Sequence, residues 1–146
     1  MRYTTVEEML DDARSRLARV GPRQAAELID DGALLVDIRP LWQRAGEGEV
    51  PGSVIVERNH LEWRLHPTSS ARLPQARPGQ RWVVLCSEGY TSSLAADALN
   101  ALGLPATDVV GGFLAWSRAG LPTVAGWTPA DQIVAATSVT EAVATS

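Results

Sequence analysis

Residues 82–93 have the sequence W-V-V-L-C-S-E-G-Y-T-S-S, which carries the clearest indication of the fold class. It opens with a continuous apolar run of strand length, which is typical of a strand buried on both faces of a parallel sheet. Cys86 follows this run directly, then comes a short loop around Gly89, and then apolar residues at helical spacing over 92–102. The stretch therefore predicts a strand, a tight loop and a helix. It places the cysteine at the carboxyl end of the strand, where ligands gather in open α/β sheets.

The alternation of strands and helices continues in both directions from this stretch. Short apolar runs at 33–36, 53–56 and 107–110 predict further strands. Apolar residues at helical spacing predict helices over 5–19, 22–30, 61–65 and 113–119, with a single helical turn over 41–44 inside a loop at 40–52. We therefore expect an α/β fold, a three-layer sandwich whose central, mostly parallel sheet carries helices on both faces.

Composition excludes several classes of protein. The chain has 146 residues, 45% hydrophobic and 21% charged, which is typical of one soluble globular domain. A net charge of −4 gives no support for nucleic-acid binding, and no apolar run is long enough for a membrane helix. The charged N-terminus lacks the apolar centre of a signal peptide, so we expect a cytoplasmic protein. A single cysteine forms no internal disulfide and supplies no zinc site, and we expect no metal and no cofactor.

Cys86 has two interpretations from its surroundings. A loop that enters a helix N-terminus presents backbone N–H groups that stabilise a thiolate, the reactive form of cysteine. Gly89 would allow a left-handed turn in that loop, and the hydroxyls of Thr91, Ser92 and Ser93 can donate to the sulfur or cap the helix. The alternative is a small core residue at a strand end, because cysteine is often buried. The glycine and hydroxyl pattern favours the reactive thiol.

Four separated motifs resemble those of the rhodanese-like domain. They are L-L-V-D-I-R at 34–39, G-E-V-P-G-S-V at 48–54, C-S-E-G-Y-T-S at 86–92 and G-G-F-L-A-W-S-R-A-G-L-P at 111–122. Their order and spacing are natural for the family. The resemblance implies a rhodanese-like domain over 21–123, preceded by an N-terminal helical extension at 1–20. A C-terminal tail at 124–146 follows, in which we expect one helix and then a frayed end.

The resemblance implies a sulfurtransferase. Its nucleophile would be Cys86, which takes a sulfane sulfur from thiosulfate, a polysulfide or a persulfide and passes it to a thiol or to cyanide. The family's substrate-binding loop corresponds to Ser87, Glu88, Gly89, Tyr90, Thr91 and Ser92, whereas Asp37 and Arg39 would support the site structurally. Small sulfur compounds are the expected partners, together with a sulfur-carrier protein as a further acceptor, and neither nucleic acid nor membrane. Monomer and homodimer both remain open.

One departure from the family, one further candidate residue and two alternative functions accompany this prediction. Some thiosulfate-active members carry basic residues after the cysteine, whereas Glu88 here would repel a dianionic donor. Arg58, which follows the second predicted strand, is our candidate for the missing positive charge. Cysteine phosphatases use a longer loop closed by an arginine six positions after the cysteine, where this chain has Ser92. A non-catalytic interaction or sulfide-sensing module remains the alternative function.

Overall fold

The computed structural model describes residues 1–128, so most of the predicted tail lies outside the described residues. The strands are β1 (Leu34–Asp37), β2 (Val54–Ile55), β3 (Trp82–Leu85) and β4 (Ala106–Asp108). The α-helices are α1 (Val6–Arg14), α2 (Pro22–Asp30), α3 (Leu41–Glu47), α4 (Leu61–Leu65), α5 (Thr91–Ala101) and α6 (Gly112–Arg118), and η1 (Arg58–His60) is a 3-10 turn. None of the helices within 1–128 is long and apolar enough to cross a membrane.

The strands form one parallel sheet in the order β2-β1-β3-β4. Val36 of β1 lies opposite Val54 on one side and Val84 on the other, so β1 and β3 are the central strands. Every residue of β3 is buried, as its continuous apolar run predicts. The α/β fold with a parallel central sheet is confirmed.

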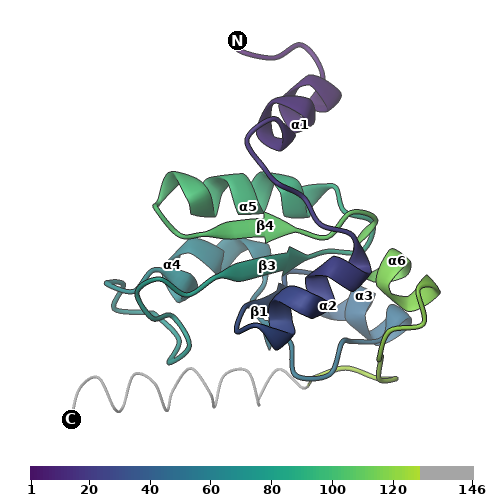
Figure 1. Ribbon diagram of the computed structural model, residues 1–146. Helices are drawn as coiled ribbons and strands as arrows, with labels where there is room; N and C mark the ends of the chain where they lie inside the picture. Colours follow the sequence, from purple (N-terminus) through teal and green to yellow (C-terminus); the bar gives the residue numbers. More distant parts are fainter. Residues whose placement is uncertain (129–146) are drawn as a thin grey trace.

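Helices cover both faces of this sheet (Figure 1). Val36 and Val84 point to a core shared with α4 and α5, whereas Leu35, Val83 and Leu85 point to a second core with α2 and α6. Successive strand residues face opposite sides, so two apolar cores flank β1 and β3. Cys86 belongs to the α4 and α5 core, which places its side chain on that side of the sheet.

The N-terminal extension differs from the prediction. The helix expected over 5–19 ends at Arg14, and the chain then turns to run beside the end of β4. Val20 donates its N–H to the Asp108 carbonyl at 3.1 Å and accepts from the Val110 N–H at 2.8 Å. These bonds satisfy backbone groups at the sheet edge, which a continued helix would leave unpaired. Helix α1 meanwhile packs against α5, so the extension contacts the rest of the domain. Figure 1 shows α1 above α5.

Candidate active site

Cys86 lies in a tight loop at the carboxyl end of β3. Its Sγ accepts a hydrogen bond from the N–H of Gly89 at 3.2 Å, and only 5% of the residue is exposed. Gly89 has a φ of +88°, so the left-handed turn expected at this glycine is confirmed. A Cβ there would also lie 2.8 Å from the Gly111 nitrogen. The loop therefore packs so closely against the chain after β4 that a residue with a Cβ atom would not fit at position 89.

The first two carbonyls of the loop accept hydrogen bonds from α6, while several N–H groups of the loop have no acceptor among the residues that the structure describes. Phe113 and Leu114, at the start of α6, donate their N–H groups to the carbonyls of Cys86 and Ser87, at 2.8 and 3.1 Å. Within residues 1–128, no protein acceptor binds the N–H groups of Ser87, Glu88 or Tyr90. The loop thus combines a fixed backbone with N–H groups that remain available to an anion.

Asp37 and Arg39 act on this loop through a third residue. They form a fully buried ion pair, with Nη2 of Arg39 2.6 Å from Oδ2 of Asp37. Arg39 also binds the Glu47 carboxylate at 3.0 Å, and Glu47 in turn accepts the Ser87 hydroxyl at 2.8 Å. Burial works against the charged guanidinium, but these carboxylates outweigh it and raise the pKa of Arg39. Buried Asp37 and Arg39 are thus linked through the partly exposed Glu47 to the Ser87 hydroxyl, and their supporting role at the site stays a prediction.

Asp108 organises the other side of the loop. This carboxylate is fully buried at the end of β4 and accepts the hydroxyls of Ser92 and Ser93 at 2.7 and 2.8 Å. Arg19 completes the set with paired hydrogen bonds at 2.9 and 3.0 Å. The two serines therefore bind neither the sulfur nor the helix end, where α5 has no side-chain cap. That expectation was wrong for them, because a buried carboxylate attracts hydroxyl donors strongly.

Comparison with protein families identifies the family of this domain. The family model of the rhodanese-like domain matches residues 21–119. The chain belongs to the rhodanese-like family. Two curated relatives are the adenylyltransferase and sulfurtransferase proteins MOCS3-1 and MOCS3-2 of Zea mays, 37% and 36% identical over 106 residues. These matches cover 69% of this chain, but they span only about a fifth, 22% and 21%, of the plant proteins.

Solved structures with the same fold are similar to this chain. A protein of unknown function from Rhodopseudomonas palustris, described as a possible tyrosine phosphatase, is 32% identical with a TM-score of 0.75. That similarity covers 85% of this chain and 98% of the other. A thiosulfate sulfurtransferase from Pseudomonas aeruginosa is 26% identical with a TM-score of 0.60, over 76% of this chain and 20% of that one. The rhodanese-like identity expected from the motifs is confirmed.

The remaining predicted residues lie toward the surface of this rhodanese-like domain. Glu88 and Tyr90 are exposed on the loop, and Thr91 is exposed at the start of α5. Arg58 lies in η1 and pairs with Glu62 at 2.8 Å, and in the described part of the chain no hydrogen bond joins it to residues 86–92. The role of Arg58 toward an anionic donor stays a prediction.

Four residues of the rhodanese-like site escaped the sequence interpretation. Glu47 and Asp108 hold the serines of the loop, and Arg14 and Arg19 of the extension both bind the Gly89 carbonyl. One signal for Asp108 was present, because an acid inside an apolar strand run requires a buried partner. The arginines carried no such signal, since basic residues late in a predicted helix are already explained by the helix dipole.

Proposed function

We propose that this rhodanese-like chain is a sulfurtransferase that carries a sulfane sulfur on Cys86 as a persulfide. The observation that carries the proposal is the surroundings of Sγ. The sulfur accepts the Gly89 N–H, while the N–H groups of Ser87, Glu88 and Tyr90 have no protein acceptor among the described residues. One N–H donor on the sulfur, with further unbonded N–H groups in the same loop, suits an anion such as a thiolate or a persulfide.

The proposed reaction has two steps. The Cys86 thiolate attacks the outer sulfur of a donor, which forms a new S–S bond while the donor's own bond to that sulfur breaks. With thiosulfate, the leaving group is sulfite. A thiol or cyanide then attacks the outer persulfide sulfur, and the thiolate is restored. Splitting the transfer in this way replaces one difficult step with two easier ones.

The test uses the only cysteine of the chain. The protein is incubated with thiosulfate, a polysulfide or a small persulfide, and its intact mass is measured before and after cyanide is added. We expect a gain of one sulfur atom, its loss with cyanide, and release of thiocyanate. Cys86→Ser should show none of these. If no donor yields a persulfide or thiocyanate, the sulfurtransferase proposal fails.

The phosphatase description of the Rhodopseudomonas palustris neighbour suggests a second assay. The position where cysteine phosphatases need an arginine holds Ser92, whose hydroxyl is buried and donates to Asp108. No arginine occurs in 86–92. We therefore expect no hydrolysis of p-nitrophenyl phosphate, and hydrolysis lost in Cys86→Ser would favour the phosphatase instead.

The non-catalytic alternative predicts a different result in the same experiment. An interaction or sulfide-sensing module would hold a persulfide on Cys86 without passing it on, or form none. A sulfur-carrier protein offered as acceptor separates these cases. Transfer of sulfur to it supports the enzyme, whereas a stable complex without transfer supports the module.

A further inference from the structure

Residues 1–20 precede the family match at 21–119, yet they reach the loop that holds the sulfur. Arg14, the last residue of α1, donates Nη2 to the carbonyl oxygen of Gly89 at 2.7 Å. Arg19, on the extended segment that follows, donates Nη2 to the same oxygen at 2.9 Å. The N-terminal extension thus contributes two cations to one backbone atom of the loop.

That backbone atom belongs to the residue that binds the sulfur. Gly89 donates its N–H to Sγ of Cys86 at 3.2 Å, and its carbonyl is held by both arginines. The described backbone has no cis peptide, so the Tyr90 N–H points away from the arginines, opposite to the Gly89 carbonyl. A second contact holds Arg14, whose Nε donates to Ser93 Oγ at 3.0 Å. The arginines therefore hold the Gly89–Tyr90 peptide unit, which directly follows the Glu88–Gly89 unit whose N–H binds the sulfur.

The charges in this cluster do not cancel. Arg19 pairs with the buried Asp108, whereas Arg14 has no carboxylate partner within residues 1–128. Arg14, Arg19 and Asp108 together carry one net positive charge beside the loop. The loop itself offers only the negative charge of Glu88, so the positive charge bound to the Gly89 carbonyl comes from the extension and not from the residues after Cys86.

We propose that Arg14 and Arg19 are positioning residues of the sulfur site, which hold the Gly89 peptide so that the loop stabilises an anionic sulfur. The proposal rests on the proposed function for its purpose, and it makes the extension part of the working site. It makes Arg14 and Arg19 a second source of positive charge, independent of Arg58.

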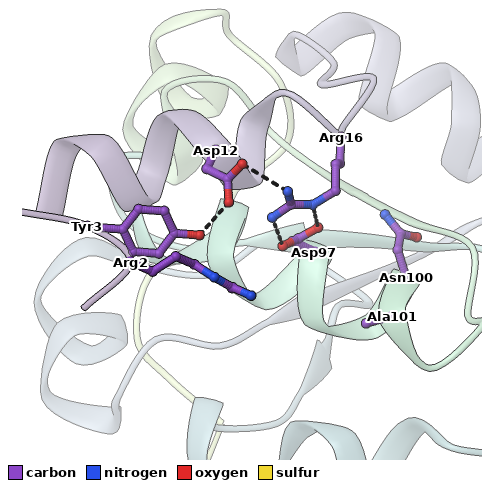
Figure 2. A pocket seen from close by; sticks show the side chains of 7 residues that line it. All are labelled: Arg2, Tyr3, Asp12, Arg16, Asp97, Asn100 and Ala101. Atoms are coloured by element: carbon purple, nitrogen blue, oxygen red, sulfur yellow. Dashed lines mark hydrogen bonds and ion pairs between the residues drawn. The ribbon is translucent and has the colours of Figure 1, made fainter.

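The test compares three arginines of the same extension. Arg16 is the matched control, because it binds Asp97 of α5 and Asp12 of α1 but no residue of the loop (Figure 2). The readouts are the rate at which iodoacetamide alkylates Cys86 and the rate of amide hydrogen exchange in the peptide containing residues 86–92. For Arg14→Ala we expect slower alkylation and faster exchange, each by about tenfold, since a donor that orients the loop is lost. Arg16→Ala removes only exposed ion pairs that help to dock α1, so it should change both rates far less than Arg14→Ala.

Arg19 needs a gentler substitution because it also neutralises buried Asp108. Arg19→Lys keeps the charge but cannot bridge the carboxylate and the Gly89 carbonyl with one planar fork. We expect it to fold and to lose part of the alkylation rate. Arg14→Ala leaves the pair of Arg19 and Asp108 intact, so it decides the question even if the Arg19 variant is unstable.

The outcomes separate this proposal from the proposed function. If Arg14→Ala and Arg19→Lys behave like Arg16→Ala in both readouts, the positioning proposal is overturned. Neither readout needs a sulfur donor, so a wild-type protein that forms no persulfide would remove the sulfurtransferase while the positioning is still judged. If persulfide does form, thiosulfate should react more slowly with Arg14→Ala and with Arg19→Lys than with the wild-type protein. The uncharged donor dimethyl trisulfide should show a smaller change.

Discussion

A Cβ atom on Gly112 would lie 2.5 Å from the carbonyl oxygen of Cys86 and 2.6 Å from that of Ser87. This close approach brings the Phe113 N–H within 2.8 Å of the Cys86 carbonyl. Gly112 also has a φ of +62°, a left-handed conformation that other residues rarely adopt. Gly112 therefore allows the start of α6 to bind the backbone of the loop that contains Cys86.

Gly112→Ala should lower both stability and sulfur transfer. The methyl group would strain the backbone and push the start of α6 away from Cys86, at a cost of about 3 kcal/mol. Gly120→Ala is the matched control, because Gly120 has a similar φ of +76° but open space at its Cβ position. Its cost should be near 1 kcal/mol, from conformational strain alone. Chemical denaturation measures both, and equal losses would show that the contact with Cys86 is unimportant.

Arg39→Ala should destabilise the protein strongly. It leaves Asp37 as a fully buried charge without its partner, and it removes the guanidinium that lies 4.3 Å from the centre of the Phe113 ring. Removing one member of a buried pair costs roughly 3–5 kcal/mol. Arg81→Ala breaks an exposed pair with Asp31 and should cost under about 1 kcal/mol. Similar denaturation midpoints for the two variants would contradict the importance of the buried pair.

Glu88→Gln should improve the use of thiosulfate. The Glu88 side chain is exposed on the sulfur loop, and its charge repels a dianionic donor. We expect kcat/KM for thiosulfate to rise by about two- to fivefold at low salt and the gain to shrink as salt screens the charge. Dimethyl trisulfide, which is uncharged, should show little change. A gain of equal size for both donors would assign the effect to loop geometry instead.

Arg58 can be tested through its partner. If its charge steers an anionic donor, Arg58→Ala should raise KM for thiosulfate. Glu62→Gln, which releases Arg58 from its 2.8 Å pair, should lower that KM. Both changes should be about threefold or less, because the side chain is partly exposed. Unchanged KM values in both variants would remove Arg58 from the site.

The docking of α1 should weaken in acid. Hydrogen bonds from Arg16 lower the pKa of Asp97 below its ordinary value of 3.8. The charged form is therefore favoured in the folded protein, so this contribution is complete above about pH 4 and disappears as the pH falls through the lowered pKa. Hydrogen exchange in α1 should rise across that range. Asp97→Asn should reduce the pH dependence, whereas Asp31→Asn, at an exposed carboxylate, should leave it unchanged.

Much of the fold was predictable because its signals are local. The apolar run before Cys86 predicts a buried strand, and β3 comprises those residues. The helical spacing over 92–102 likewise predicts α5 within one residue at each end. The prediction failed over 5–19, where the spacing continues beyond Arg14 but the chain leaves the helix to pair Val20 with Val109. Helical spacing does not reveal that a sheet edge competes for the same backbone groups.

The α/β sheet, the loop after β3 and the cysteine in that loop could be predicted, because each depends on neighbours within a few residues. The contacts that hold the loop could not be predicted, because they form only when distant segments pack together. Glu47 reaches Ser87, and Arg14 reaches Gly89, across long stretches of chain. Such contacts depend on where β1, β4 and the N-terminal extension come to lie around β3. Cys86 can be identified from the sequence alone, whereas the charges and donors that bind its loop are brought there by the folding of distant segments.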